Sequence, residues 1–341
     1  MTAILNTTQI QNATSTTPNI TLDTAGNAQF GGMPYGGSSF LRNRIINGAM
    51  DFAQRGTSFS SPANVSYTLD RWFVSWNGAA PATVAQVTGP TGYRYALQMT
   101  GATNNTAVYL QQRIESYNCS DLSGQTVTIQ ANISVSSAQT VYWSLSYPTA
   151  QDNYASTTSI ASGTWSATTT ATVFTATITG LPSGATNGLL LVIAPQNGGA
   201  FTSGTITITG VQLELGSVAT PFERRQYGHE LALCQRYYVR LHNNNLPYVQ
   251  FAVGRAYSTT NGSANVILPV SMRTTPTFGY TTPVSGNFDY GATALGTSAF
   301  AGNINNNYSV NITAPLTSGQ AFVLAAANVS TYVYIDFSAE L

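Results

Sequence analysis

Residues 208–238 read ITGVQLELGSVATPFERRQYGHELALCQRYY, and the apolar periodicity of the chain changes within this stretch. Up to Leu215 the apolar residues nearly alternate, which is typical of a strand with one buried face. A Gly-Ser pair and Pro221 then interrupt the pattern. Beyond this point the apolar residues recur at helical spacing and would share one helix face: Tyr227, Leu231, Cys234 and Tyr238. The sequence therefore predicts that one β domain ends near Arg225 and that a different part of the chain begins there.

The composition favours sheet over helix. Of the 341 residues, 43% are hydrophobic and only 7% are charged, against roughly 25% charged in an ordinary soluble domain. Thr, Ser, Asn and Gly take the place of the missing charges, and β-branched residues fit a pleated, half-buried surface. The chain is long enough to bury one or two sizeable cores. We therefore predict an all-β protein.

Alternating segments separated by turn residues predict three parts. Residues 1–42 form an extended Asn/Thr/Ser-rich arm that ends in a Gly-rich linker, with a strand-turn-strand at residues 20–30. Residues 43–225 hold a β-sandwich, with strands expected at 93–99, 107–114, 125–135, 140–147, 170–179, 189–194 and 205–215. Residues 226–341 hold the short helix and a smaller C-terminal β-sandwich, with strands expected at 248–257, 264–269, 321–326 and 331–337.

Charge and targeting signals exclude several classes of partner. All twelve basic residues are arginines, the formal net charge is zero, and no basic run with interleaved aromatics occurs, so we expect no nucleic-acid binding. No apolar stretch reaches the length of a membrane span and no secretion signal is visible, so no membrane insertion is expected. Cys119 and Cys234 fall in different predicted domains and are expected to be buried free thiols.

The titratable residues do not predict an enzyme. The chain has two histidines, twelve carboxylates and no lysine, and it contains none of the motifs of serine hydrolases, zinc proteases or phosphate-binding loops. We expect no cofactor. A glycan depolymerase that uses two carboxylates, for example Asp51 and Asp70, is the enzymatic alternative. Asp70 lies in the word LDRW, however, where a short carboxylate more simply fixes a turn by accepting backbone N–H bonds.

Several words of the sequence resemble those of tail-fibre-type proteins of tailed bacteriophages. The junction carries ITGVQLELG, ATPFERR and YGHELALCQRYY, and the other words follow in the same order as in that family: NRIINGAMDF (43–52), TLDRW (68–72), PVSMRTTP (269–276) and DFSAEL (336–341). Two of these words, NGAMDF and ITGVQLELG, also resemble the first and last strands of carbohydrate-binding jelly-roll modules, in which the terminal strands pair. The resemblance therefore implies a jelly roll for residues 43–225.

The family resemblance also implies a role. It implies a virion structural protein, a homotrimeric tail fibre or similar appendage whose residues 1–42 attach to other tail or capsid proteins of the particle. The C-terminal domain would then face the host and adhere to host cell-surface glycan, with weak contacts summed by avidity. The alternative is a purely architectural head fibre or connector that touches no receptor, and the depolymerase is the second alternative.

The predicted helix is the expected contact between copies of the chain. Its apolar stripe of Tyr227, Leu231 and Tyr238 either packs within its own domain or meets symmetry copies. Charge is rare elsewhere, so Arg236 and Glu230 are expected to bridge chains or domains rather than to face water.

Binding a glycan calls for exposed aromatic rings among neutral hydrogen-bonding groups. Trp72 and Trp143 lie in apolar strand contexts and are expected in the core. Trp76, before an Asn-Gly pair, and Trp165, in a Ser/Thr-rich stretch, are expected at the surface. In the C-terminal part, Asn- and Tyr-rich loop words supply further candidates at a distal tip: Asn243–Asn245, Tyr290, Asn305 and Tyr308.

Related jelly-roll modules often hold a structural calcium between their first and last strands, which would implicate Asp51 and Glu214. This chain departs from that pattern, because Thr209 or Gly210 stands where such sites have a carboxylate in the last strand. Too few hard oxygen ligands remain, so we expect no metal.

Overall fold

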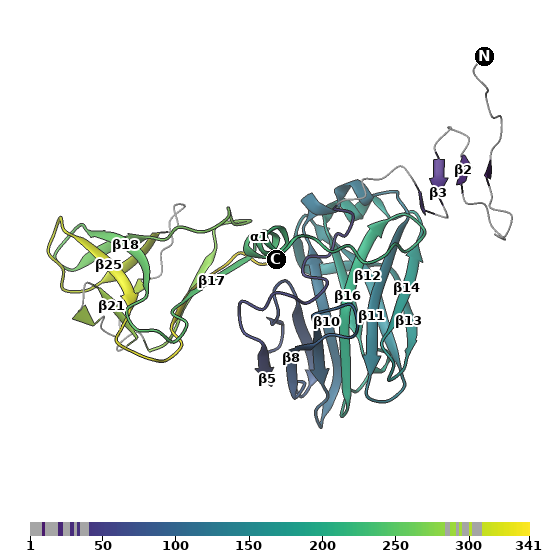
Figure 1. The fold of residues 1–341 in the computed structure, drawn as a ribbon, viewed down its shortest axis with the longest axis horizontal. Helices are drawn as coiled ribbons and strands as arrows, with labels where there is room; N and C mark the ends of the chain where they lie inside the picture. The colour runs from purple at the N-terminus through teal and green to yellow at the C-terminus, as the bar shows by residue number, and fades with distance from the viewer. Residues whose placement is uncertain are drawn as a thin grey trace, which may run out of the picture. The chain divides into compact units, whose positions relative to one another are not determined.

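The computed structural model describes residues 9–10, 20–22, 28–30, 33–34, 41–283, 287–290, 293–294, 300–301 and 309–341. Its strands form five antiparallel sheets, and one α-helix occurs within these ranges (Figure 1). The predicted all-β class is therefore confirmed. The chain divides into two compact units, residues 1–225 together with Leu341, and residues 226–340.

Four short strands lie in the N-terminal region and pair in sequence order: β1 (Gln9–Ile10), β2 (Ile20–Leu22), β3 (Ala28–Phe30) and β4 (Met33–Pro34). Strands β2 and β3 pair with Ile20 opposite Phe30. They are the two arms of the predicted strand-turn-strand, and the residues of the turn lie outside the described part.

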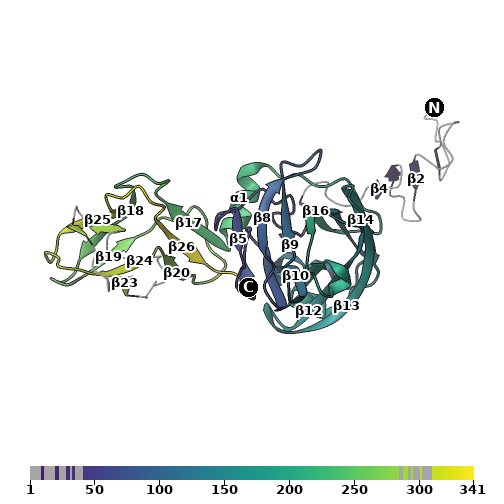
Figure 2. The same cartoon turned by 90° about the horizontal axis from the view of Figure 1, so that it is seen from below.

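Two six-stranded sheets make a jelly-roll β-sandwich, seen as two layers in Figures 1 and 2. The first, here called the β16 sheet, has the order β14 (Thr172–Ile178), β11 (Val127–Val135), β16 (Thr205–Leu215), β9 (Tyr95–Thr100), β8 (Thr83–Thr88), β5 (Ser58–Ser60). The second, the β10 sheet, has the order β13 (Asn153–Ala167), β12 (Gln139–Ala150), β15 (Leu189–Ala194), β10 (Asn105–Ile114), β7 (Phe73–Gly78), β6 (Ser66–Tyr67). Short 3₁₀ turns occupy Ser116–Asn118, Ser120–Leu122, Ser183–Asn187 and Gln196–Gly198.

A β-bulge in β16 explains why its apolar residues alternate imperfectly. Pairing with β11 shifts so that Gly210 and Val211 together face Ala131. Gly210 has φ of +59°, which a residue without a Cβ adopts at no steric cost. The extra residue resets the alternation, and the core then receives the completely buried Ile206, Ile208, Val211 and Leu213.

The segment at residues 43–50 ties the two sheets together. The Arg44 N–H donates to the Leu213 carbonyl (2.8 Å), and the Val211 N–H donates to the Gly48 carbonyl (2.9 Å). On its other side the main chain of Ile46 exchanges two hydrogen bonds, both 2.8 Å, with the amide of Gln112 in β10. The word NGAMDF thus bonds to the main chain of ITGVQLELG, but it does so as an irregular segment and not as the first strand that the resemblance implied.

The second unit is a smaller β-sandwich around one core. A three-stranded sheet has the order β17 (Tyr238–His242), β26 (Tyr334–Ser338), β20 (Thr277–Tyr280). A seven-stranded sheet has the order β22 (Thr293–Ala294), β21 (Phe288–Tyr290), β25 (Ala321–Ala326), β18 (Gln250–Ala256), β19 (Asn261–Asn265), β24 (Ser309–Thr313), β23 (Phe300–Ala301). Both sheets contribute to the core, among others through Val239, Ile335, Phe337, Phe288 and Leu324.

The helix α1 (Tyr227–Gln235) is shorter than the apolar stripe predicted. The chain leaves the helix at Arg236, and Tyr238 is the first residue of β17, where it pairs with Ser338. The prediction that Tyr238 shares the helix face is therefore wrong, because strand pairing replaces the last helical turn. No helix in the described ranges is long and apolar enough to span a membrane.

Gly48→Ala is expected to lower the free energy of unfolding of the first unit by about 1–3 kcal/mol, because overpacking displaces neighbouring atoms. A Cβ at this position would stand 2.1 Å from the Val211 carbonyl oxygen. All four tryptophans lie within residues 1–225, so denaturant unfolding followed by tryptophan fluorescence reports on this unit.

The matched control is Gly228→Ala, at a helical glycine of the second unit whose Cβ would meet nothing within 4 Å. It should leave the tryptophan transition unchanged. Equal transitions for Gly48→Ala and the parent would show that the segment at residues 43–50 is not held as described.

Candidate functional site

The two tryptophans predicted at the surface of the first unit both pack inward. Trp165 lies in β13, is 6% exposed, and stacks between Trp143 (ring centroids 5.8 Å apart) and Phe174 (6.0 Å). Its indole N–H donates to the Thr175 carbonyl. Trp76 lies in β7, half-buried against the core, with its indole N–H on the Pro62 carbonyl. The expected exposure of Trp165 is wrong, because the Ser/Thr-rich segment around it is a strand and not a loop.

Two of the predicted tip residues, Tyr290 and Asn243, are buried and engaged within their unit, whereas Asn244 and Asn245 are exposed. Tyr290 is 8% exposed in β21, and its hydroxyl donates to the Pro315 carbonyl (2.7 Å). Asn243 is completely buried, and its side-chain amide bridges the main chain of Val333, Leu246 and Thr331. Asn305 and Tyr308 lie outside the described residues.

The residues predicted to contact other copies differ in their exposure. Tyr227 is 71% exposed, while Leu231, Glu230 and Arg236 are half-buried. Tyr238 is buried, and its hydroxyl donates to Asp336 Oδ2 within its own unit. Tyr227 is therefore the predicted contact residue with the most surface to offer a partner.

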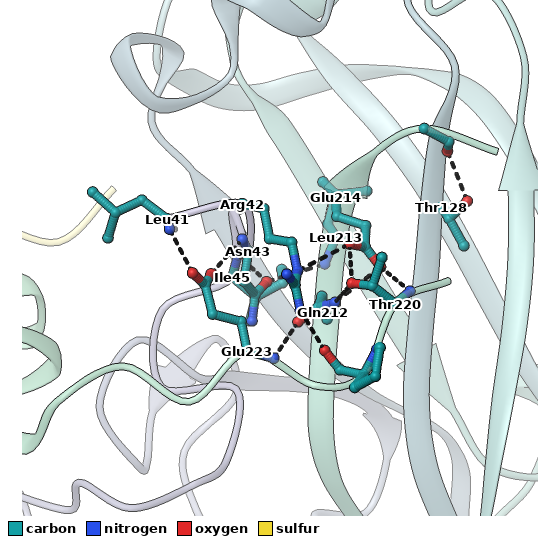
Figure 3. A network of polar contacts seen from close by, with 12 residues as sticks. Leu41, Arg42, Asn43, Ile45, Thr128, Gln212, Leu213, Glu214, Thr220 and Glu223 are labelled. Atoms are coloured by element: carbon teal, nitrogen blue, oxygen red, sulfur yellow. Dashed lines mark hydrogen bonds and ion pairs between the residues drawn. The ribbon is translucent and has the colours of Figure 1, made fainter. Parts of the chain in front are cut away.

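Glu214, one of the two calcium candidates, lies in a buried polar network (Figure 3). Its carboxylate accepts hydrogen bonds from Gln212 Nε2 (2.9 Å), the Thr220 N–H (2.7 Å) and the Thr220 hydroxyl (2.5 Å). Arg42 Nε forms an ion pair with it at 3.3 Å. The protein itself thus supplies both donors and countercharge to this carboxylate.

The same network holds the end of the arm. Glu223 accepts hydrogen bonds from the N–H groups of Leu41 and Asn43, and its own N–H donates to Gln212 Oε1 (Figure 3). Arg225 donates to the carbonyls of Asn43 and Ile45. Within the residues that the structure describes, no group of three or more His, Cys, Asp and Glu side chains is placed to hold a metal ion.

The carboxylates and the Cys119 thiol of the first unit are held by the fold and are not arranged for catalysis. Asp70 is 1% exposed and accepts hydrogen bonds from the Gln54 N–H (2.9 Å) and the Gln54 side-chain amide (2.5 Å), so it holds the backbone of an earlier segment. Asp51, the other calcium candidate, is half-buried.

Burial, with a smaller contribution from the Asp152 carboxylate, raises the pKa of the Cys119 thiol to about 12. This thiol is therefore protonated near neutral pH and a poor nucleophile.

The outer surfaces of the two sheets differ in accessibility. On the β16 sheet, the outward side chains Thr128, Gln130, Gln212 and Glu214 are at most 5% exposed. Residues 217–225 cover them, through bonds such as Thr177 Oγ1 to the Ser217 carbonyl (3.1 Å). This part of the β16 sheet is closed to a ligand.

The outer surface of the β10 sheet, here called the β10 face, is more accessible than this part of the β16 sheet. Alternate residues of β10 point outward and are half-buried, namely Tyr109, Gln111 and Arg113. The paired strands add Val192 opposite Gln111 and Leu190 opposite Arg113, also half-buried. One strand further out, Tyr142 and Ser144 of β12 continue the same rows. The face therefore combines aromatic rings, an amide, hydroxyls and one guanidinium.

Each end of the β10 face carries tyrosine rings. At one end, Tyr109 and Tyr142 lie on either side of Gly198, and the Tyr109 hydroxyl donates to the Gly198 carbonyl (3.3 Å). At the other end, the Arg113 guanidinium carbon lies 4.5 Å from the Phe73 ring centroid and 5.3 Å from that of Tyr154. These contacts hold the planar guanidinium in place.

The donors at this second end already bind an oxygen atom. Arg113 and the Tyr67 hydroxyl both donate to the main-chain oxygen of Leu341, which belongs to the first unit. The Tyr154 hydroxyl donates to the carbonyls of Ile114 (2.6 Å) and Leu189 (3.2 Å), and burial raises its pKa, so the phenol stays neutral. Chemically, the β10 face offers hydrogen bonds and stacking rather than general acid–base groups.

Sequence reasoning missed Tyr109, Gln111 and Arg113 although the strand that carries them was expected. The signal was present in AVYLQQRI, where these residues alternate with Val108, Leu110 and Gln112. The i, i+2, i+4 spacing places them on one side of a strand. Tryptophan is the stronger local signal for a sugar-binding ring, but in this chain the tryptophans pack against the core.

Comparisons with known proteins give structural similarity only. No protein-family model matches the chain. No curated protein matches it. Among solved structures, it is similar to a putative sugar-binding protein from Bacteroides thetaiotaomicron (TM-score 0.37, 14% identity, 51% of this chain and 100% of that chain). It is also similar to a CBM4 structure (TM-score 0.34, 19% identity, 50% and 99%) and to the enzymatically active domain of tailspike protein 4 of bacteriophage CBA120 (TM-score 0.34, 16% identity, 51% and 21%).

Glu214→Gln is expected to destabilise the first unit by about 1–3 kcal/mol, because an amide N–H₂ would face donors that the carboxylate now satisfies. The surface pair Arg44–Asp121 supplies the matched control, since the Asp121 side chain is 56% exposed. Asp121→Asn should change stability by less than about 1 kcal/mol. The measurement is the tryptophan unfolding transition of each variant.

Calcium or a chelator should leave the same transition unchanged, because Arg42, Gln212 and Thr220 already occupy the Glu214 oxygens. A calcium-dependent rise in the midpoint that disappears in Glu214→Gln would contradict this assignment.

Proposed function

We propose that this chain is an adhesive subunit of a tailed-bacteriophage particle and that its β10 face binds uncharged glycan on the host surface. The observation that carries the binding part is the partly exposed row of Tyr109, Gln111 and Arg113 with Tyr142 beside it. The virion part is supported by the family words that run in order from residue 43 to residue 341.

The chemistry of the face suits sugars. A pyranose presents hydroxyls that need neutral donors and acceptors, and flat C–H surfaces that pack on aromatic rings. Gln111, Ser75 and Ser144 supply amide and hydroxyl groups between the tyrosines. Arg113 is the one charged side chain in the central rows, and it is a donor only, so the face discriminates against cationic ligands.

We propose adhesion without cleavage of the glycan in preference to a depolymerase or a purely architectural protein. The rows of the β10 face carry no Asp or Glu within the described strands, whereas glycoside hydrolysis ordinarily needs two. Trp165 and Tyr290 were candidates for contact with a glycan, but both are buried in the core of their own unit. At these two positions the structure favours the alternative of an architectural protein without receptor binding. The accessible tyrosines of the β10 face favour adhesion.

Assembly is part of the proposal. Residues 1–42 would attach the subunit to other proteins of the virion, and three copies would associate through the helix around Tyr227. Three weak sites on one appendage would then bind a repetitive surface much more tightly than one site does.

Tyr109→Ala and Gln111→Ala are each expected to weaken glycan binding about tenfold, because stacking and hydrogen bonds contribute about 1 kcal/mol or more each. The full chain is first screened against immobilised host polysaccharides, and affinity electrophoresis then compares the variants. Gln98→Ala is the matched control, since Gln98 points outward on the other sheet and bonds Thr207 Oγ1 (3.0 Å). Equal binding by all three variants would refute the β10 face as the site.

Sedimentation equilibrium of the full chain is expected to give three times the 36.0 kDa chain mass. Tyr227→Glu should shift it towards one copy, because it places charge on the most exposed predicted contact. Tyr117→Glu, at an 86% exposed tyrosine of the first unit, should not. A monomeric parent protein, or antibodies to residues 226–341 that fail to label particles encoded by the same genome, would count against the assembled virion subunit.

A further inference from the structure

The three-stranded sheet of the second unit carries a polar aromatic surface on the side away from its core. Across β17 and β26, Arg240 pairs with Asp336 and His242 pairs with Tyr334. On the other side of β26, Gly279 of β20 pairs with Asp336. Directly paired residues share one face of a sheet, and the alternate residues, such as Val239, Ile335 and Phe337, fill the core. Asp336 therefore stands at the centre of the outer face.

Asp336 is held by bonds to one of its two oxygens. Oδ2 accepts hydrogen bonds from the Tyr238 hydroxyl (2.6 Å) and from Arg240 Nη2 (2.7 Å) and Nε (3.3 Å). The guanidinium carbon of Arg240 also lies 3.8 Å from the centroid of the Tyr334 ring. The carboxylate is thus fixed in position and its charge is balanced by one cation.

The other oxygen, Asp336 Oδ1, accepts no hydrogen bond from the residues that the structure describes. The position beside it is Gly279, where a Cβ would stand 2.2 Å from Oδ1. The Asp336 side chain is only 13% exposed. Oδ1 is not fully buried, so water reaches it and a donor from outside the chain can take the place of that water.

Aromatic rings extend from this acceptor to the surface. The Tyr332 and Tyr334 ring centroids are 6.0 Å apart, and the His242 ring lies 5.1 Å from that of Tyr332. Tyr332 is 41% exposed and His242 is exposed. Burial, and then the Arg240 guanidinium, lower the pKa of His242, so its ring is neutral near pH 7.

We propose that this surface is a second glycan site, which binds one uncharged pyranose ring with a sugar hydroxyl donating to Asp336 Oδ1 and a C–H face packed on Tyr332. Charge complementarity selects this occupant, because Arg240 and Asp336 cancel each other and His242 is neutral. A second copy of the chain would need an apolar or oppositely charged surface to match, which the polar rings and the fixed acceptor do not favour. The site stands in the second unit and does not depend on the β10 face.

The test uses full-length protein that carries Tyr109→Ala and Gln111→Ala, so that the β10 face is disabled. Saturation-transfer NMR with the methyl glycosides of glucose, galactose, mannose and N-acetylglucosamine measures binding of single pyranoses. At least one glycoside is expected to bind with millimolar affinity. Tyr332→Ala should then weaken it about tenfold by loss of stacking, and Gly279→Ala should weaken it at least as much by placing a methyl group against Oδ1.

Tyr257→Ala is the control, because Tyr257 is a 59% exposed tyrosine of the same unit away from this surface. If Gly279→Ala disturbs strand β20, loss of binding in that variant says nothing about Oδ1. Tyr332→Ala removes an exposed ring without this risk and therefore tests the site by itself. Absence of binding by every glycoside, or equal binding by the Tyr332 and Tyr257 variants, overturns the second site. A change of sedimentation mass in Tyr332→Ala also overturns it, because the surface would then lie between copies.

The proposals for the two sites can be refuted independently of each other. If Tyr109→Ala and Gln111→Ala leave binding of host polysaccharide unchanged while Tyr332→Ala lowers it, the β10 face is wrong and the second site stands. The opposite result leaves the β10 face standing alone.

Discussion

The hydrogen bonding of Asn43 to strand β16 is the interaction on which the first unit depends. Asn43 Oδ1 accepts the N–H groups of Ile45 (2.9 Å) and Leu213 (3.1 Å), and Nδ2 donates to the Val211 carbonyl. With Asn43 only 3% exposed, these main-chain groups have no water to replace it. The contact brings the start of the domain against its last strand and lets residues 217–225 return over the β16 sheet. The β10 face is the surface that this closure leaves accessible.

Much of the fold was predictable because apolar alternation and turn residues are local signals. The bounds of β15, β16 and β25 agree with the expected strands to the residue. The 15-residue strand β13 was missed, since its sequence NYASTTSIASGTWSA is rich in Ser and Thr and most of its side chains are exposed at the sheet edge. The helix was predicted two to three residues too long, because Tyr238 fits a helical stripe and a strand equally well and only pairing with Ser338 decides between them.

The candidate site was harder to predict than the fold because residue type is a weak guide to accessibility. Of the two tryptophans expected at the surface, Trp165 is stacked between Trp143 and Phe174 in the core, and Trp76 is half-buried against it. The exposed aromatic surface consists of tyrosines whose neighbours come from other strands, such as Tyr142 beside Tyr109 across β15. Likewise Asp336 and Gly279 are distant in sequence, and their juxtaposition follows from sheet register alone. The sequence of one segment alone does not indicate which residue of another strand will lie beside it.

The bulge at Gly210 restricts how this strand can change in length. On either side of it the buried residues keep period two, with Ile206 and Ile208 before and Val211 and Leu213 after. Removal of Gly210 would leave Ile206, Ile208, Val211 and Leu213 in one strict alternation, so these side chains would stay inward without the bulge. Insertion of one further residue between Gly210 and Val211 would instead turn Gln212 and Glu214 towards the apolar interior. In relatives of this chain the bulge is therefore the position where the strand can lose one residue, while burial of Gln212 and Glu214 opposes the gain of one.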